Sequence, residues 1–160
     1  MLYFICIYKG VIILKIAIGS DHAGLELKNH IKGYLEAKGF EVTDCGTYTS
    51  DSCNYPEFGE KVALAVKSGE ATKGVLVCGT GVGISIAANK VKGIRAVVCS
   101  EPYSAEMAVR HNNANIVSFG ARVIGQATAE TIVDAFFGAE YEGERHAKRV
   151  ALISEIESRN

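Results

Sequence analysis

Residues 75–89 read VLVCGTGVGISIAAN, in which Cys78 is followed by glycines at positions 79, 81 and 83. The apolar run ending at Cys78 predicts a buried strand, and residues 84–90 have the composition of a helix. A glycine-rich turn between the two directs backbone N–H groups toward the strand end, where the positive end of the helix favours an anion. Thiols ionise more readily in such a position. The segment therefore predicts an anion site with Cys78 as a base or nucleophile.

Three familiar kinds of glycine-rich loop fail on specific positions. A P-loop needs Gly-Lys followed by Ser or Thr, which the chain lacks. A GxGxxG motif starting at Gly79 or Gly81 needs glycine where the chain has Ile84 or Ile86. Glu101 lies at a suitable distance to hold a ribose, so a nucleotide site stays as an alternative. A Cys-x5-Arg phosphatase loop also needs arginine at Ile84. What remains is an anion-binding loop with a thiol.

Cationic side chains that could bind a phosphate lie later in the chain. Arg145 and Arg149 are four residues apart on one predicted helix face, with His146 between them, and Arg122 follows the fifth predicted strand. Guanidinium groups bind phosphate oxygens in a bidentate manner. The alternative is a basic helix face exposed to solvent. Surface or helix-end positions are likewise the alternative for His22 and His111.

Five apolar segments alternate with helical ones. The strands are predicted at residues 11–18, 40–43, 75–78, 94–99 and 115–119, and the helices at 25–38, 56–69, 84–90, 102–110, 128–137 and 144–158. This order predicts an α/β, Rossmann-like, open five-stranded parallel sheet with helices on both faces, in a single domain. Ligands of such sheets bind beyond the carboxyl ends of the strands, where Asp21, His22 and residues 78–83 and 100–101 would lie.

Composition narrows the class of protein. The chain has 160 residues and a formal net charge of −1, so its charge points to neither nucleic acid nor an anionic membrane. Five irregularly spaced cysteines without a CxxC pair favour reduced thiols and a cytoplasmic location over disulfides or a zinc site. Lys9 and Lys15 interrupt the apolar N-terminus, which disfavours a membrane helix. Residues 1–14 are interpreted as an extension or an extended first strand, and residues 15–160 as the domain.

Eight motifs in one order identify a family. They are GSDHAG (19–24), DCGT (44–47), YP (55–56), CGTGVGIS (78–85), SEPY (100–103), HN (111–112), FGAR (119–122) and ERH (144–146). From about Lys15 to its end, the chain resembles the family of B-type ribose-5-phosphate isomerases, which also holds the galactose-6-phosphate isomerase subunits. The resemblance implies an aldose–ketose isomerase of the pentose phosphate pathway that interconverts D-ribose 5-phosphate and D-ribulose 5-phosphate through an enediolate. It implies no metal or other cofactor, and a homodimer with shared active sites that in some members pairs into a tetramer.

The resemblance also implies a role for each candidate residue. Catalysis falls to Cys78 as the base, to Thr80 as a neighbouring proton-handling hydroxyl, and to His111, with Asp21, in opening the sugar ring. The substrate-binding residues are Asp21, His22, Tyr55, Gly79, Thr80, Gly81, Val82, Gly83 and Asn112. The phosphate-binding residues are Arg122, Arg145, His146 and Arg149. The family suggests that the partner subunit supplies His111 and Arg122.

Two alternatives to a ribose-5-phosphate isomerase stay open at this point. The first is an isomerase of a six-carbon sugar phosphate, either allose 6-phosphate or galactose 6-phosphate. The second is a non-catalytic sugar-phosphate sensor, which would need neither Cys78 nor His111. A redox-sensing thiol protein is disfavoured, because no resolving cysteine lies near Cys78 in the sequence.

Overall fold

Five parallel strands form one sheet in the computed structural model, which describes residues 14–160. Most of the predicted N-terminal extension and the first residues of the predicted first strand lie outside this range. The strands lie in the order β2-β1-β3-β5-β4. Their bounds are β1 Lys15–Ser20, β2 Glu41–Asp44, β3 Lys73–Cys78, β4 Ala96–Val98 and β5 Ile116–Gly120. The predicted parallel α/β sheet is confirmed.

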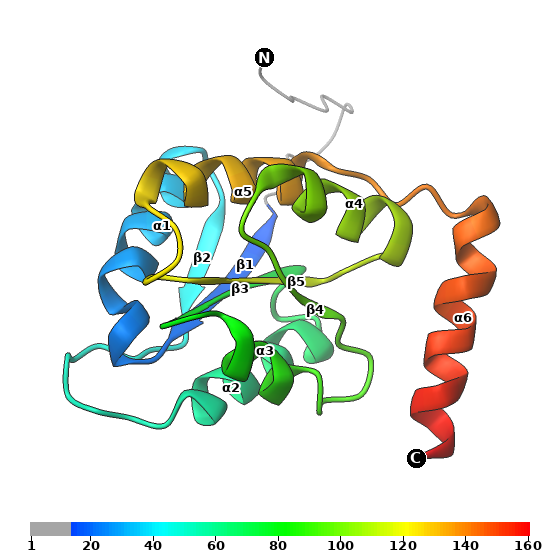
Figure 1. The fold of residues 1–160 in the computed structure, drawn as a ribbon, viewed down its shortest axis with the longest axis horizontal. Coiled ribbons are helices and arrows are strands. Elements are labelled where there is room, and N and C mark those ends of the chain that lie inside the picture. The colour runs from blue at the N-terminus through cyan, green and yellow to red at the C-terminus, as the bar shows by residue number, and fades with distance from the viewer. Residues whose placement is uncertain (1–13) are drawn as a thin grey trace.

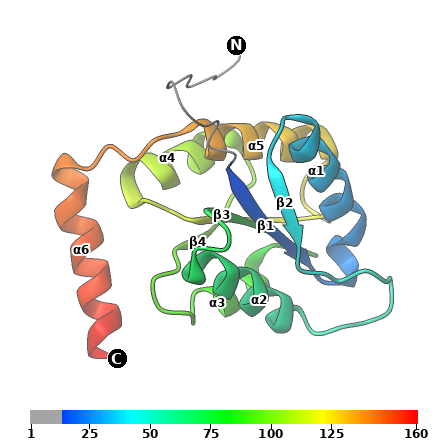
Figure 2. The same ribbon diagram turned by 180° about the vertical axis from the view of Figure 1, so that it is seen from behind.

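Helices cover both faces of the sheet (Figure 1). One face carries α1 (Leu25–Ala37), α4 (Pro102–Asn112) and α5 (Gln126–Gly138), and the other carries α2 (Tyr55–Ser68) and α3 (Val82–Ala88). Figure 2 shows both layers from behind. A single 3-10 turn, η1 (His22–Gly24), joins β1 to α1. Among residues 14–160, no helix is both long and apolar enough to cross a membrane.

The alternation of side chains along each strand divides the core in two. Val75 and Val77 of β3 pack on the side of α1, α4 and α5, whereas Leu76 and Cys78 pack on the side of α2 and α3. All four are buried. Apolar residues at successive positions are typical of a strand covered on both faces. Cys78 therefore points toward α2 and α3, at the end of a strand that the core fixes.

The helix boundaries follow local signals. Gly69 ends α2 in the left-handed region at φ +81°, as its place after the last apolar residue predicts. Pro102 opens α4, and the Glu101 carboxylate accepts the N–H of Ser104 at 3.0 Å, so this carboxylate caps a helix. The helix predicted to begin at Ile84 begins two residues earlier, at Val82, directly after Gly81.

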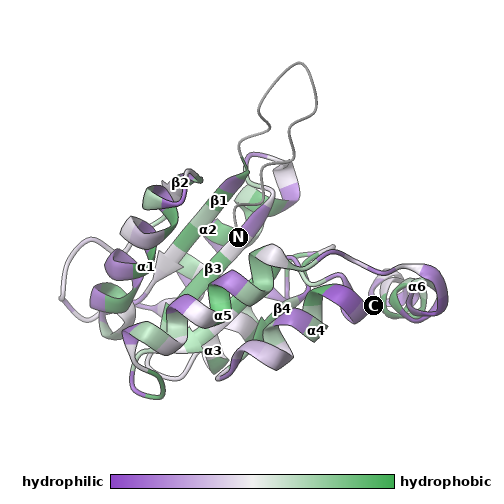
Figure 3. Ribbon diagram, turned by 90° about the horizontal axis from the view of Figure 1, so that it is seen from above, coloured by the Kyte–Doolittle hydropathy of each residue, from purple (hydrophilic) through white to green (hydrophobic). Residues whose placement is uncertain are grey.

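The last helix, α6 (Glu144–Arg159), stands outside both helix layers. It lies beside the β4 end of the molecule, and the view from above shows it end-on and apart from the sheet (Figures 1 and 3). Its main contacts within the chain are with α4. Leu152, Ile153 and Ile156 are each roughly half exposed on it. The periodicity correctly predicts the helix but does not indicate that its apolar stripe stays uncovered within one chain.

Candidate active site

The strand order reverses between β1 and β3, which places a crevice at their carboxyl ends. β1 is followed in space by β2 on one side, and β3 by β5 and β4 on the other. Such a reversal is where open parallel sheets bind ligands. Asp21 follows β1 directly, and Cys78 is the last residue of β3. The Asp21 N–H donates to the Val77 carbonyl at 3.3 Å, so the two strand ends are joined at this crevice.

The glycine loop after β3 folds back over the sulfur of Cys78. The N–H of Gly81 donates to Cys78 Sγ at 3.1 Å. The Cys78 side chain is only 5% exposed and packs with the apolar residues beneath α2 and α3. Thr80 is exposed, and its hydroxyl accepts the Val82 N–H at 3.3 Å. The thiol is therefore the floor of the loop, and the threonine hydroxyl is at its outer surface.

Strand β5 holds the loop in place. The Ser118 hydroxyl donates to the Gly81 carbonyl at 2.7 Å, and both residues are buried. Gly81 has a φ of +80°, and a Cβ there would lie 2.8 Å from the Phe119 backbone. A Cβ on Gly120 would lie 2.6 Å from the Thr80 backbone. Only glycine fits at such separations, so the loop and the end of β5 are in close contact through their backbones.

Two further candidates reach the loop from other elements. The ring of Tyr55, at the start of α2, covers Gly83, where an added Cβ would lie 2.7 Å from the ring. Arg122 follows β5, its N–H donates to the Gly79 carbonyl at 3.1 Å, and its guanidinium group lies beside Gly79. Arg122 therefore belongs with the loop of its own chain, whereas the resemblance suggests the partner subunit as its source.

Asp21 and His22 line the crevice from the β1 side. Asp21 is 6% exposed, and its Oδ1 accepts the Gly24 N–H at 3.0 Å, which caps η1. The Nδ1 atom of His22 accepts the Cys53 N–H at 3.3 Å. His22 also lies on the wall of an open hollow of about 460 Å³ between the starts of α1 and α5. Among the described residues, none hydrogen-bonds to the second carboxylate oxygen of Asp21.

A second group of candidates gathers where α4 meets α6. The rings of His111 and His146 are stacked, with centroids 4.2 Å apart, and Arg145 Nε donates to His146 Nε2 at 3.2 Å. Burial of His146 lowers its pKa, and the positive charges of His111, Arg145 and Arg149 lower it further. Asn112 lies beside His111 in the last turn of α4. We call His111, Arg145, His146 and Arg149 the basic cluster.

Glu142 is a member of this region that the sequence does not reveal. Its Oε2 lies 3.6 Å from His146 Nε2 and 4.0 Å from His111 Nε2, and its Oε1 accepts from Arg110 Nε at 2.7 Å. Two imidazoles and a carboxylate are donors that suit zinc. Here, however, guanidinium groups already bind His146 and Glu142, and positive charges surround the cluster. The arrangement is better suited to an anion than to a cation.

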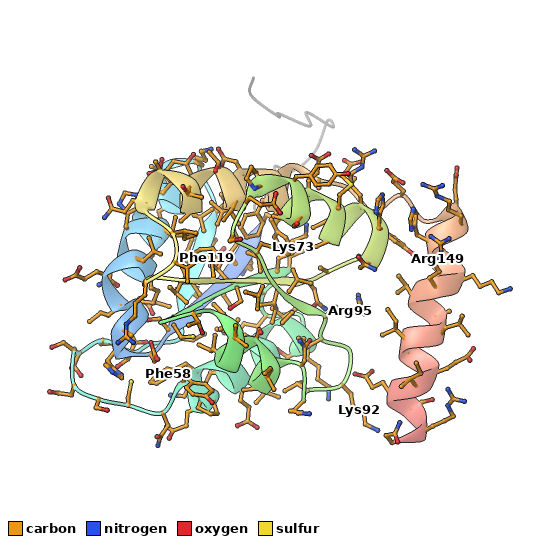
Figure 4. All side chains as sticks on the ribbon, in the orientation of Figure 1. Phe58, Lys73, Lys92, Arg95, Phe119 and Arg149 are labelled. Carbon is orange, nitrogen blue, oxygen red and sulfur yellow. The ribbon has the colours of Figure 1, made fainter. Side chains whose placement is uncertain are left out.

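The residues around the glycine loop and the basic cluster lie in different regions of the folded molecule. A helix between parallel strands runs back along the sheet. The first residues of α4 therefore lie at the sheet edge that carries the glycine loop, and its last turn, with His111, lies near the opposite edge. Figure 4 places Arg149 at the α6 end and Phe119, whose backbone touches Gly81, on the other side of the body. One chain therefore brings Cys78, Thr80, Asp21, His22, Tyr55 and Arg122 together but keeps the basic cluster apart from them.

Comparison with known proteins gives consistent results. Residues 16–153 match the profile of the family described as Ribose/Galactose Isomerase. The chain is 56% identical to the ribose-5-phosphate isomerase B of Escherichia coli K12, over 91% of this chain and 97% of the relative. It is 46% identical to the D-erythrulose-4-phosphate isomerase of Pectobacterium atrosepticum, over 90% and 95%. The structure of ribose-5-phosphate isomerase B from Clostridium thermocellum superposes with a TM-score of 0.90 at 55% identity, covering 91% of this chain and 99% of that one.

Proposed function

The chain belongs to the ribose/galactose isomerase family, and on that premise we propose that it interconverts D-ribose 5-phosphate and D-ribulose 5-phosphate. The single observation that carries the proposal is the glycine loop closed over Cys78, with Asp21 from the neighbouring strand end beside it. Isomerisation of an aldose needs a base for a carbon-bound proton and donors for the negative charge that follows. The loop offers both.

The proposed proton transfer uses these positions. Cys78, as a thiolate, removes the proton from C2 of the open aldose, and the charge moves to the carbonyl oxygen on C1. Thr80, whose hydroxyl is exposed at the loop surface, moves a proton from the C2 oxygen to the C1 oxygen. Cys78 then delivers its proton to C1, which leaves a C2 ketone. Loop N–H groups stabilise the enediolate more than the neutral aldehyde, and such selective stabilisation accelerates the reaction.

Ribose 5-phosphate is mainly cyclic, so its ring opens first. His111 of the partner subunit takes the proton of the anomeric hydroxyl and later returns it to solvent, while Asp21 relays a proton from solvent to the ring oxygen. The C1 carbonyl and a C4 hydroxyl result. Asp21 Oδ1 is held by the Gly24 N–H, so Oδ2 is the oxygen available for this transfer. The buried backbone around Asp21 keeps this oxygen at the crevice.

The active site is shared between two subunits in this proposal. The basic cluster, at the α6 end, meets the glycine loop of a second chain and binds the substrate phosphate together with that chain's Arg122. The half-exposed stripe of Leu152, Ile153 and Ile156 supports an interface there, since apolar side chains that stay uncovered on one chain commonly mark a contact surface. A hollow of about 530 Å³ between α6 and the edge of β4 continues this surface. A second copy of the chain is the occupant that completes the site.

The test is an isomerase assay with ribose 5-phosphate in the presence of a chelator. We expect full turnover, because the residues assigned to the proton transfer need no metal. The same preparation is then assayed with allose 6-phosphate and galactose 6-phosphate, the six-carbon alternatives. Erythrulose 4-phosphate is added because one relative is described as a D-erythrulose-4-phosphate isomerase. A kcat/KM higher on any of these than on ribose 5-phosphate would reassign the substrate. Binding of sugar phosphates without turnover would favour a sensor.

A cytoplasmic location is part of the proposal. The four cysteines within residues 14–160 are all free thiols, which suits a reducing compartment. Fractionation of cells that produce the protein tests this, and activity confined to a membrane or secreted fraction would contradict it.

A further inference from the structure

Lys28 is a lysine with no exposed surface in a part of the molecule that the proposed mechanism does not use. It lies in the second turn of α1, and its side chain is 0% exposed. Its Nζ donates to Asp44 Oδ1 at 2.8 Å, to Asp44 Oδ2 at 2.9 Å and to the Thr47 carbonyl at 2.8 Å. Burying an ammonium group is costly unless it is paired and hydrogen-bonded. All three Nζ donors are used, so the surroundings are built for this cation.

The partners of Lys28 belong to one turn, residues 44–47, which begins at the last residue of β2. Within this turn, Asp44 Oδ1 also accepts the Gly46 N–H at 2.9 Å. The lysine therefore holds both ends of the turn, through a carboxylate at residue 44 and a carbonyl at residue 47. We call residues 44–47 the anchored turn.

The anchored turn is joined by its backbone to the residue before Asp21. The Ser20 N–H donates to the Gly46 carbonyl at 2.6 Å, and the Thr47 N–H donates to the Ser20 carbonyl at 2.7 Å. Ser20 is 0% exposed, so this connection lies inside the molecule. The next residue, Asp21, donates its N–H to Val77, directly before Cys78. A continuous path of buried hydrogen bonds thus runs from Lys28 Nζ to the crevice.

We propose that Lys28 is a positioning residue, which fixes the Asp21 carboxylate in the active site through the anchored turn. The inference rests on the proposed function, because it assigns Asp21 to the reaction. Lys28 itself does not touch the substrate. A misplacement of about 1 Å in a site can reduce a rate by about 100-fold. Loss of this ammonium group would therefore reduce turnover without changing any group that reacts.

The test compares Lys28→Met with Lys32→Met, which is one turn further along α1 and pairs with Glu36 near the surface. We expect kcat to fall about 10- to 100-fold in Lys28→Met while KM changes less than about 3-fold, because the basic cluster that binds the phosphate is untouched. Lys32→Met keeps both constants. Hydrogen exchange at the Ser20 and Thr47 amides reports the position directly, and we expect faster exchange there in Lys28→Met alone.

Two further variants keep the result interpretable. Lys28→Met combined with Asp44→Asn removes both charges of the pair, so no unpaired carboxylate is left and this variant folds even if the single variant does not. The Thr47 carbonyl still lacks its donor in it. We expect the low kcat to persist in this variant. Leu35→Ala, a core truncation on the same helix, is destabilised but keeps the anchored turn, and should retain kcat below its melting temperature.

Wild-type kcat in a folded Lys28 variant, or unchanged exchange at Ser20 and Thr47, would overturn the inference. The failure of the proposed function is separate from this, since it would appear as an inactive wild-type protein. The amide exchange is measured without substrate and stands in either case.

Discussion

The imidazole rings of His111 and His146 lie parallel, with 4.2 Å between their centroids and 6° between their planes. His111 lies in the last turn of α4 and His146 in the first turn of α6, so this stack joins the outlying helix to the body. His146 is 5% exposed, whereas its neighbours in the first turns of α6 are exposed. The stack therefore fixes where the basic cluster stands relative to α4.

Protonation of His146 links stability to pH. Its pKa lies below the ordinary 6.5, because burial and then the nearby positive charges disfavour the protonated ring, although Glu142 opposes this. In the window between 6.5 and the lowered value, the unfolded chain binds a proton that the folded chain does not, so stability falls as pH falls. Urea unfolding at a series of pH values from about 7.5 to 5.5 should show this decline. In His146→Gln the decline should be shallower, and an equal slope in both proteins would contradict the assignment.

Cys78→Ala should abolish isomerisation and preserve substrate binding. Loss of a general base typically lowers a rate by about 100- to 10,000-fold, and the residues that bind the substrate's phosphate remain. Turnover and calorimetric binding of ribose 5-phosphate measure the two effects. Cys99→Ala is the matched control, because Cys99 is equally buried but packs with α4 and α5, away from the loop. Near wild-type turnover in Cys78→Ala would remove the thiol from its role.

Arg149→Ala should chiefly raise KM. The phosphate is bound alike in the ground and transition states. Loss of the Arg149 contact therefore weakens substrate binding without slowing the reaction of the bound complex. One charge-assisted contact is worth about 1.5–3 kcal/mol, which corresponds to roughly 10- to 100-fold in KM. Lys148→Ala, at the adjacent exposed position, is the control. A lower kcat at unchanged KM would instead place Arg149 in the chemical step.

Mixing two impaired variants should restore activity when it is measured at a substrate concentration far below the KM of Arg149→Ala. If each site combines the glycine loop of one chain with the basic cluster of the other, a dimer of Cys78→Ala and Arg149→Ala chains holds one intact site and one doubly altered site. Random exchange makes half of the dimers mixed, so the mixture should reach about one quarter of wild-type activity. The variants are unfolded and refolded together, with each alone as the control. No recovery in a mixture shown to contain mixed dimers would rule out a shared site.

Gly83→Ala should have the same effect on activity as loss of the Tyr55 ring. A methyl group on Gly83 would lie 2.7 Å from that ring, and Tyr55, being 41% exposed, can swing outward. We expect a small change in melting temperature, together with kinetic constants close to those of Tyr55→Ala. The double variant then adds nothing further, as a double-mutant cycle would show. Additive losses would mean that Gly83 acts independently of Tyr55.

The sequence predicts what depends on neighbours along the chain. Periodicity and glycine placement locate the five strands and six helices, with boundary shifts of a few residues, and they place Cys78 at the strand end that faces the crevice. β4 is shorter than the predicted 94–99, as only Ala96–Val98 pair with β5. Local spacing can identify an element but not where its pairing stops at the edge of a sheet.

Contacts between distant residues are what the sequence does not predict. Glu142 joins Arg110 across 32 positions and Lys28 joins Asp44 across 16, and neither pair has a local motif. The sequence groups Arg145, His146 and Arg149, which are adjacent on α6, but it does not show that His111 of α4 joins them. It does not reveal that this group stands away from Cys78 in one chain, because that separation depends on how α6 leaves the body.

The close backbone contacts of Gly81 with Phe119 and of Gly120 with Thr80 have a thermodynamic consequence. A loop this tightly wedged against a strand has few other conformations, so its N–H groups are already aligned before a sugar enters. The entropy lost in aligning them is part of the folding free energy and does not recur at each turnover. The glycines, which carry no reactive group, thus allow the close packing that aligns the N–H donors of the loop in advance.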